Sequence, residues 1–402
     1  GYANWMLLLA GGKSPGGQQG VIPSDGVAVF QQWNLKDEDG HWYPDPLVPL
    51  SGPIAVPCLE NRVPGQQVQA LYVDIWVPHR TPPGEYGGTL SLTANGVPPV
   101  DVPVSLTVWD FTLPDALGFV CEMNGYGYPK AESWEGALNL HRLAHRNRLN
   151  VNIVPYSHSG NWTVGPMGME ATGRGKDMRV ASFDGFDRHF GPLLSGSAFV
   201  DNPRAGVPVP AFYLPLYENW PCKLADAFTF DQTAQHVDIR EDFTQAYKDG
   251  FVAVCRSIAQ HLDRKGYHGT SFQFFLNNKY QYAPEMTFWL LDEPMFRDDF
   301  LAIQFFGELA RTGFKDCGQV TVDYRIDCSR VQEARGMMNT VDTMVFSQSN
   351  VREYGTIARN FMRSYLPKAP GGARNGWEYG GAGSVASQPI APRGWALDAW
   401  LG

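Results

Sequence analysis

The hydrophobic periodicity of the chain changes near residue 115, and this change constrains the fold more than any other feature of the sequence. Before that point, short alternating runs of polar and apolar residues are separated by Pro and Gly, which is typical of antiparallel strands. The clearest run, residues 69–77, places four apolar side chains on one face: Leu71, Val73, Ile75 and Val77. Beyond residue 115, apolar strands alternate with helical patterns. The sequence therefore predicts an α/β plus β protein with two domains, a β-sandwich over residues 1–115 and a (β/α) domain over residues 116–402.

The second domain offers about seven strand-like runs, which favours a (β/α)8-like barrel of the TIM type. These runs include residues 271–277, 287–291, 319–325, 343–347 and 375–379. A doubly wound open sheet is the alternative, but no Gly-rich nucleotide-binding turn follows any early strand. No eighth strand is evident before residue 402, so either the barrel is open at its C-terminal end or the native chain continues.

Two longer segments of this domain have a clear character. Residues 157–207 are rich in Gly, Pro and polar residues, so we expect a long loop that shapes a binding site. From about Glu241, apolar residues recur at helical spacing: Phe243, Tyr247, Phe251, Val254, Ile258 and Leu262. We expect a helix there that packs one apolar face on the sheet.

Charge and motif content exclude several functions. The formal net charge is −9 and no Lys/Arg-rich run interrupts it, so nucleic acids and anionic membranes are not expected partners. The apolar stretches are shorter than the roughly 20 residues that a membrane span needs. His141 and His145 lack a recognisable third metal ligand, and residues 37–42 lack the ligand series of a calcium loop. We expect neither a metal nor an organic cofactor.

The segment from Leu290 to Pro294 is the most informative for chemistry, because an apolar run there delivers two carboxylates, Asp292 and Glu293. The carboxyl ends of barrel strands face the active site. Neighbouring residues on a regular strand point to opposite faces, so both carboxylates reach one pocket only where the strand breaks. Pro294 supplies that break. A solvated acidic turn that caps the next helix is the competing interpretation.

Three segments occur in the order found in glycoside hydrolase family 123 and its uncharacterised relatives. They are residues 68–77 followed by 82–89, the segment from Val108 to Pro114, and the acidic pair with Pro294. The chain resembles that family from about residue 50 to about residue 400. The resemblance implies a β-sandwich that precedes a (β/α) barrel.

The characterised members of this family resemble exo-acting β-N-acetylgalactosaminidases that use the 2-acetamido group of their own substrate. By resemblance, Glu293 is the general acid/base and Asp292 orients and charge-stabilises the acetamido group. Two adjacent carboxylates do not lie on opposite sides of a glycosidic bond, as the two acids of a conventional glycosidase do. A nucleophile within the substrate makes this placement unnecessary. Glu293 then requires a raised pKa, which we expect burial and the neighbouring charge of Asp292 to provide.

Other strand ends supply polar edges and stacking rings suited to a sugar pocket. The candidates for substrate binding are Asn124, Tyr156, His158, Asn277, Tyr324, Trp377 and Tyr379. The high aromatic content, 13%, suits sugar stacking but equally suits large aromatic cores. The expected partner is a terminal 2-acetamido glycan, and the expected location is secreted, periplasmic or at the cell surface. A homo-oligomer is left open.

Two rival functions accompany this hypothesis. The first is a non-catalytic carbohydrate-binding or cell-surface structural protein that keeps a glycosidase-like barrel. The second is a conventional two-carboxylate glycosidase, in which Glu122 or Glu218 supplies a second acid across the pocket from Glu293.

Overall fold

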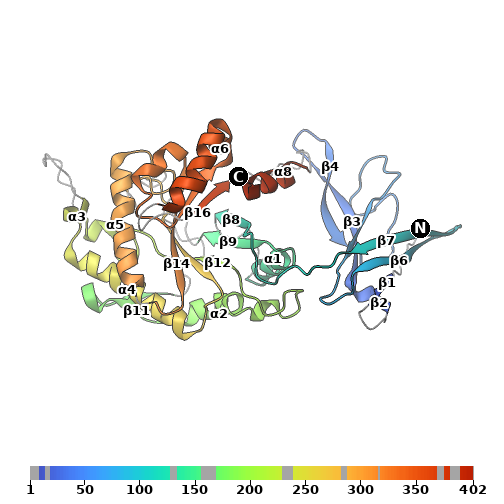
Figure 1. Ribbon diagram of the computed structural model, residues 1–402, viewed down its shortest axis with the longest axis horizontal. Coiled ribbons are helices and arrows are strands. Elements are labelled where there is room, and N and C mark those ends of the chain that lie inside the picture. Colours follow the sequence, from blue (N-terminus) through green and yellow to red (C-terminus); the bar gives the residue numbers. More distant parts are fainter. Residues whose placement is uncertain are drawn as a thin grey trace. The chain divides into compact units, whose positions relative to one another are not determined.

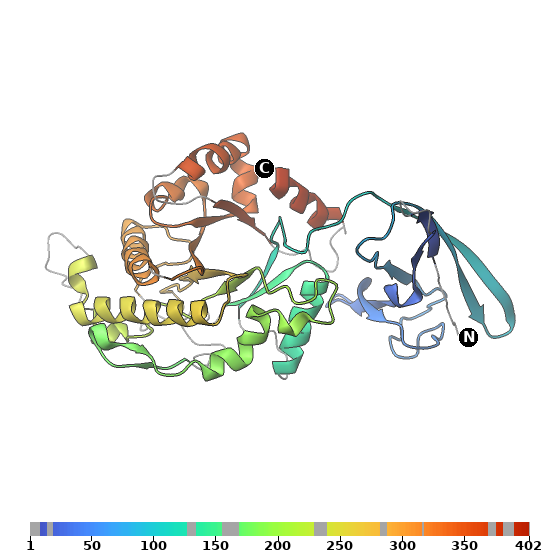
Figure 2. The ribbon, with the colours of Figure 1, turned by 60° about the horizontal axis from the view of Figure 1, so that its bottom comes forward.

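The computed structural model describes residues 9–13, 19–126, 134–154, 169–228, 239–281, 288–315, 317–368, 375–380 and 390–401. The chain divides into two compact units, which Figures 1 and 2 colour by sequence. The first unit is Gly1–Pro114 with Ala382–Gly394, and the second is Asp115–Gly381 with Trp395–Gly402. The assignment of residues 390–394 to the first unit was not predicted from the sequence.

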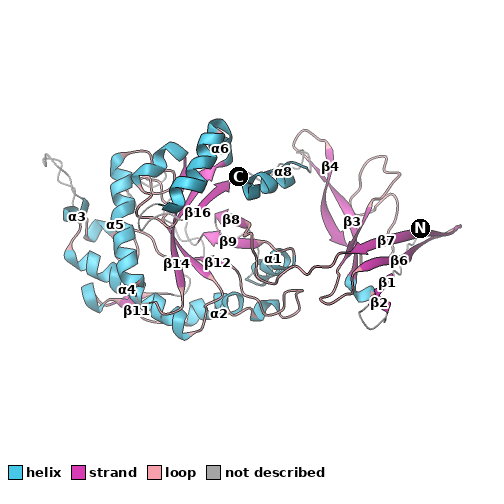
Figure 3. Ribbon diagram, viewed as in Figure 1, coloured by secondary structure: helices cyan, strands magenta, loops and turns pink. Residues whose placement is uncertain are grey.

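The first unit contains two antiparallel sheets (Figure 3). One has the order β2-β1-β6-β7 and is formed by β1 (Leu9–Lys13), β2 (Gln19–Ile22), β6 (Gly84–Ala94) and β7 (Val97–Val108). The other has the order β4-β3-β5 and is formed by β3 (Val27–Lys36), β4 (Trp42–Pro49) and β5 (Leu71–Ile75). One apolar core joins both sheets, with Leu9 and Tyr86 from the first and Val27, Val73 and Ile75 from the second. A shared core between two sheets is the layering of a β-sandwich.

The second unit contains parallel strands whose spatial order follows their order in the sequence. Strands β8 (Glu122–Tyr126) and β9 (Asn150–Val154) form one sheet, and the other has the order β12-β13-β14-β15-β16. The strands of the latter are β12 (Ala211–Tyr213), β13 (Ser271–Phe275), β14 (Thr321–Ser329), β15 (Thr343–Ser347) and β16 (Asn375–Tyr379). The Asn150 amide donates to the Ala211 carbonyl at 3.1 Å, which links β9 to β12.

This order distinguishes between the two topologies considered above. A doubly wound sheet reverses its strand order at a switch point. Here each strand lies beside the next one in the sequence, which is the order found in a (β/α) barrel. Within the ranges that the structure describes, no strand pairing joins β16 to β8, so a closed eight-stranded barrel is not observed.

Helices α4 (Gln245–Arg264) and α5 (Arg297–Phe314) pack against the parallel strands (Figure 2). The remaining helices are α1 (Trp134–Arg146), α2 (Asp184–Leu194), α3 (Ile239–Asp242), α6 (Gln348–Tyr354), α7 (Thr356–Asn360) and α8 (Ile390–Leu401). Helix α4 starts after Thr244, whose hydroxyl accepts a hydrogen bond from the Tyr247 amide at 3.3 Å, as an N-cap does. The apolar face of α4 is buried in the core that also holds Phe272 and Phe274 of β13.

The expected long loop over residues 157–207 contains regular structure. Helix α2 and the short paired strands β10 (Ala171–Thr172) and β11 (Arg179–Val180) lie within it, so the loop prediction was wrong for the part that the structure describes. Phe186, Phe190 and Leu193 are buried on one face of α2. Their burial stabilises a helix despite Gly185, Gly191 and Pro192 in the same segment, because tertiary packing overrides weak local propensity.

Candidate active site

The sequence predicted that the acidic pair ends a strand of the sheet, but the structure places the pair elsewhere. After β13 the chain forms a hairpin-like return, in which Lys279 pairs antiparallel with Leu290 and the Leu291 amide donates to the Asn278 carbonyl at 2.9 Å. The apolar run before Asp292 is buried in the core, with Trp289 and Leu291 almost fully covered. The run is apolar because it is buried in this core, not because it forms a strand of the sheet. Asp292 and Glu293 therefore lie in the connection between β13 and α5.

The helix-cap interpretation of the acidic pair does not fit this geometry. Helix α5 begins at Arg297, and the carboxylate of Asp299 accepts the amides of Met295 and Phe296 at 3.1 and 2.9 Å. Asp299 thus satisfies the N-terminal amides that a capping side chain serves. The cap of α5 is therefore provided by Asp299, not by Asp292 or Glu293.

The backbone of Glu293 has a conformation that L-residues rarely adopt, with φ at 56°. Its amide donates to the Asp327 carbonyl on β14 at 2.8 Å, which holds the segment against the end of that strand. Such a conformation costs about 1–3 kcal/mol and persists only where the surrounding structure fixes it. Ser329, at the end of β14, has the same sign of φ, at 56°. The fold thus holds the Glu293 backbone in an energetically unfavourable conformation, and this conformation directs its side chain.

The Glu293 carboxylate is held by side chains from three different segments. One oxygen, Oε2, receives the Lys279 ammonium at 2.6 Å. The other, Oε1, accepts the Ser329 hydroxyl at 2.7 Å and the Tyr379 hydroxyl at 2.9 Å. Ser329 and Tyr379 also contact each other at 2.7 Å. Ser329 and Tyr379 are the last residues of β14 and β16, and Lys279 lies in the segment that follows β13, so all three donors lie on the side of the carboxyl ends of parallel strands, at which binding sites form.

The expected raised pKa of Glu293 is contradicted by this environment. Burial raises the pKa of the carboxyl, but hydrogen bonds from Lys279, Ser329 and Tyr379 and the charge of Lys279 outweigh it and lower the pKa to about 2. Donors that bond the charged form stabilise it. Glu293 is therefore a carboxylate in this arrangement. Tyr379 shows the complementary effect, since burial and Glu293 raise the pKa of its phenol.

This depressed pKa predicts a contribution of Glu293 to stability in acid. The group stabilises the fold fully above its unfolded pKa of about 4.3 and loses that contribution as the pH falls toward about 2. We expect the free energy of unfolding, measured by urea titration across this window, to fall more steeply for the wild type than for Glu293→Gln. Equal slopes for the two proteins would show that the Lys279, Ser329 and Tyr379 contacts do not favour the charged form.

Asp292 is buried beside Glu293 and faces the same cation. Its carboxylate lies 3.6 Å from the Lys279 ammonium, and its amide is directed to the Asn278 carbonyl at 3.3 Å. Lys279 is itself buried. The positive φ of Glu293 turns the chain between the two residues, so that both carboxylates reach one ammonium. A regular strand would have sent them to opposite faces.

A second polar cluster is buried among the parallel strands and is centred on Arg325 of β14. Its guanidinium contacts Glu122 of β8 at 2.7 Å and Asp327 at 2.8 Å, and it donates to the Gln273 side chain at 3.1 Å. Gln273 in turn donates to Glu122 at 2.6 Å, as does Asn152 at 3.1 Å. Burial opposes the charge on Arg325, but Asp327, Tyr213 and Glu122 raise its pKa well above the usual range. The guanidinium stays charged.

Aromatic rings surround this guanidinium. The carbon at its centre lies 5.3 Å from the Tyr213 ring, 5.1 Å from the Phe275 ring and 5.8 Å from the Trp377 ring. Such distances give cation–π attraction in addition to the ion pairs. Asp327 joins this Arg325 cluster to the acidic pair, because its side chain binds Arg325 while its carbonyl holds the Glu293 amide.

Six of the seven predicted substrate-binding residues fall into four groups. Tyr379 contacts Glu293 directly, and Trp377 contacts Arg325. Asn124 accepts the Tyr213 hydroxyl at 2.9 Å beside the Arg325 cluster. Asn277 is fully buried at the end of β13. Tyr156 and His158 lie outside the described residues.

The prediction for Tyr324 was wrong. Adjacent residues of a strand face opposite sides, and Arg325 faces the polar cluster. Tyr324 therefore faces the helix layer, where its hydroxyl donates to the Ile303 carbonyl of α5 at 2.9 Å and its ring packs on Phe274. It is a core residue.

Three residues of the site were not predicted: Lys279, Ser329 and Asp327, whereas the sequence places Arg325 among the polar residues of a late strand. Arg325 was recognisable as a charge inside an otherwise apolar strand, because a charge buried between strands requires a partner. Ser329 and Asp327 were missed because β14 runs to Ser329, beyond the expected end at residue 325. Lys279 carries no local signal, since its pairing with Leu290 forms across ten intervening positions of the chain.

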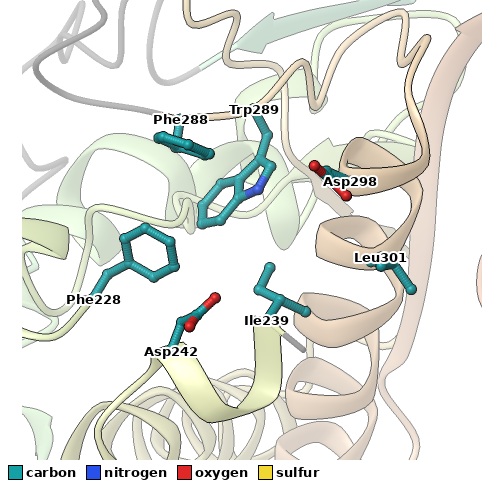
Figure 4. Close-up of a pocket in the computed structure, with 7 residues that line it drawn as sticks. All are labelled: Phe228, Ile239, Asp242, Phe288, Trp289, Asp298 and Leu301. Carbon is teal, nitrogen blue, oxygen red and sulfur yellow. The ribbon is translucent and has the colours of Figure 1, made fainter. Parts of the chain in front are cut away.

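An apolar pocket near the hairpin is lined by Phe228, Ile239, Asp242, Phe288, Trp289, Asp298 and Leu301 (Figure 4). A larger hollow lies near the amino ends of the strands and includes Asp323, Tyr324 and Asp342. Neither hollow is lined by Asp292 or Glu293. The ring-lined concavity expected around the acidic pair is therefore not among these two.

Asp37, Asp39 and His41 form the one group of potential metal ligands within the described ranges, with ligand atoms within 4.8 Å of one another. The His41 amide donates to Asp37 at 2.7 Å, and the group is largely exposed in the turn between β3 and β4. Among the helices that the structure describes, none has the length and apolarity to cross a membrane.

Comparison with known proteins gives structural likenesses only. No family profile and no curated protein matches the sequence. A family 123 glycoside hydrolase from Clostridium perfringens, described for glycolipid glycan hydrolysis, is 11% identical with a TM-score of 0.49, covering 96% of this chain and 64% of its own. This chain thus spans less than two thirds of that protein.

More distant likenesses are to other glycoside hydrolases. A β-glucuronidase from Parabacteroides merdae is 8% identical with a TM-score of 0.29, over 94% of this chain and 40% of its own. A family 39 glycoside hydrolase from Bacteroides cellulosilyticus is 11% identical with a TM-score of 0.28, over 81% of this chain and 52% of its own. All three are glycoside hydrolases, and the first belongs to the family that the sequence motifs resemble.

Proposed function

We propose that the chain is a glycoside hydrolase that removes a terminal 2-acetamido sugar, with Glu293 as general acid/base and Asp292 as the residue that orients the acetamido group. The single observation that carries this proposal is the meeting of the two carboxylates at one buried ammonium, on a strained turn at the carboxyl ends of parallel strands. Strained backbone and paired carboxylates concentrate where chemistry occurs.

The adjacency of the pair favours substrate-assisted catalysis over a conventional route. Two catalytic carboxyls of a conventional glycosidase stand about 5–5.5 Å or 6.5–9.5 Å apart on opposite sides of the bond that breaks. Glu122 does not supply a second acid readily, because Arg325, Gln273 and Asn152 already engage its carboxylate. Glu218 is fully buried, and Tyr247 donates to its main-chain carbonyl at 2.5 Å.

In the proposed reaction, Glu293 donates its proton to the leaving oxygen as the bond from that oxygen to the anomeric carbon breaks. The acetamido carbonyl oxygen forms the new bond to the anomeric carbon, and Asp292 accepts the acetamido N–H and stabilises the positive charge that develops there. Water then attacks the anomeric carbon and gives a proton to the Glu293 carboxylate, while the bond to the acetamido oxygen breaks. The sugar leaves with its original anomeric configuration, and Glu293 is protonated again.

A second function is favoured by one specific observation. Both oxygens of Glu293 are occupied by Lys279, Ser329 and Tyr379, and this carboxylate lacks a proton at neutral pH. A protein that keeps this arrangement when sugar binds would be a non-catalytic carbohydrate-binding protein. Catalysis requires that binding loosen the hold of Lys279 on Glu293.

A panel of aryl glycosides tests the proposal, with a 2-acetamido and a 2-hydroxy member for each sugar. We expect the wild type to release the aryl group from a 2-acetamido glycoside and to leave its 2-hydroxy partner essentially uncleaved, because the 2-hydroxy sugar lacks the internal nucleophile. Equal cleavage of both members would point to a conventional glycosidase. Binding of the sugars without release of any aryl group would establish the non-catalytic alternative.

A further inference from the structure

The ammonium of Lys279 is shared unequally between the two proposed catalytic carboxylates. It lies 2.6 Å from Oε2 of Glu293 and 3.6 Å from Oδ2 of Asp292. The backbone of Lys279 is fixed by its pairing with Leu290, and the next amide, of Tyr280, donates to the Trp289 carbonyl at 3.1 Å. The flexible part is the side chain, whose terminal bonds rotate between staggered positions. A small rotation of the Lys279 side chain toward Asp292 moves its ammonium from the Glu293 carboxylate to the Asp292 carboxylate.

The two carboxylates also differ in their exposure to solvent. Asp292 is buried, whereas the Glu293 side chain is 38% exposed and can be reached by a ligand. A glycosidic oxygen that approaches Glu293 competes with Lys279 for the same carboxylate. Asp292 gives the displaced ammonium an alternative partner within the protein, so that no buried cation is left without a counter-charge.

We propose, on the basis of the glycosidase function above, that Lys279 is a positioning residue that pairs with Glu293 until a glycoside binds and then transfers its ion pair to Asp292. Glu293 then loses its cation and takes up a proton from solvent only in the occupied site. This exchange supplies the protonated acid that the first chemical step requires.

Other groups that face Glu293 do not provide this exchange. Ser329 and Tyr379 donate neutral hydroxyls to Oε1. Arg330, at the end of β14, is directed to the Glu293 carbonyl at 3.4 Å and is paired with Glu333 at 2.7 Å. Asp327 offers Glu293 its main-chain carbonyl, while its carboxylate binds Arg325. Among the described contacts, Lys279 is the cation that touches the Glu293 carboxylate.

The pH dependence of turnover tests this exchange. The value of kcat/KM reports ionisation in the free enzyme, and kcat reports ionisation in the substrate complex. In the wild type, acting on an aryl 2-acetamido glycoside, we expect the alkaline limb of kcat to lie at higher pH than that of kcat/KM. In Lys279→Met the limb of kcat/KM should move upward by about 1–3 pH units, toward that of kcat, because the free enzyme has lost the cation beside Glu293.

Two variants serve as controls. Lys279→Arg keeps a cation and should keep the two limbs separate. Lys265→Met removes the ammonium that pairs with Asp187 at 2.8 Å, just beyond α4 and before β13 begins, and should leave both limbs unchanged.

The outcomes separate this inference from the proposed function. Wild-type turnover with coincident limbs, or with a separation that persists in Lys279→Met, would overturn the role of Lys279 and leave the glycosidase proposal intact. A wild type without turnover on any 2-acetamido glycoside would overturn both. Where Lys279→Met does not fold, coincident limbs in the wild type alone still overturn the role of Lys279.

Discussion

Replacing Glu293 with Gln is expected to lower kcat/KM for a methyl 2-acetamido glycoside by about 10²–10⁴-fold, the usual contribution of a positioned general acid. The amide has nearly the shape of the carboxyl and can still accept the Ser329 and Tyr379 hydroxyls at its oxygen. It cannot deliver a proton to the leaving oxygen. Steady-state kinetics with sugar release as the readout provide the measurement.

The matched control is Glu308→Gln. Glu308 lies on α5 of the same unit, is largely exposed and pairs with Arg240 at 2.6 Å. We expect its activity to equal that of the wild type. If Glu293→Gln remains folded by circular dichroism and keeps wild-type kcat/KM, Glu293 is not the acid.

Replacing Arg325 with Met has the largest expected effect on stability, a loss of about 3–5 kcal/mol. The change removes the buried cation that pairs with Glu122 and Asp327 and leaves both carboxyls among the strands without a counter-charge. It also removes the cation that lies over the Tyr213, Phe275 and Trp377 rings. Urea unfolding followed by the fluorescence of the aromatic residues measures the loss.

Arg311→Met is the comparison for this change. Arg311 pairs with Asp342 at 2.9 Å, but its side chain is 41% exposed, and exposed pairs contribute about 1 kcal/mol or less. Adding Glu122→Gln to Arg325→Met should recover part of the loss, because it removes one of the stranded charges. A cost for Arg325→Met no greater than that for Arg311→Met would contradict the central place of Arg325 in the polar cluster.

The strand pattern of the second unit could be predicted from the sequence where apolar runs are short and bounded. Strands β15 and β16 span 343–347 and 375–379, as the sequence predicts. Residues 287–291 were predicted as a strand of the sheet, and this prediction was wrong. A buried apolar segment has the same composition whether it joins a sheet or packs beneath one. Only the antiparallel contact of Lys279 with Leu290 distinguishes the two cases.

The site itself was only partly predictable. The sequence singled out Asp292 and Glu293 because two carboxylates and a proline follow an apolar run, and each of these signals is local. The positive φ of Glu293 and Ser329 carries no such signal, because neither residue is the Gly that usually marks it. The partners of Glu293 come from three strand ends far apart in the chain, so its lowered pKa depends on the fold.

Tyr324 and Tyr379 were both predicted to bind substrate, but they face different parts of the structure. Both are tyrosines on strands of one sheet, and composition does not separate them. Position along the strand does: Tyr379 is the last residue of β16 and reaches Glu293, whereas Tyr324 lies within β14 and faces α5. A register fixed by Arg325, the buried charge next to it, would have assigned Tyr324 to the core.

The most direct test of the acid role of Glu293 compares two 2-acetamido glycosides of one sugar that differ only in the leaving group. A methyl glycoside needs a proton on its leaving oxygen, whereas a dinitrophenyl glycoside departs as a stable anion. We predict that Glu293→Gln loses about 10²–10⁴-fold in kcat/KM on the methyl glycoside and keeps nearly wild-type kcat/KM on the dinitrophenyl glycoside. An equal loss on both glycosides, or no loss on either, would contradict the account.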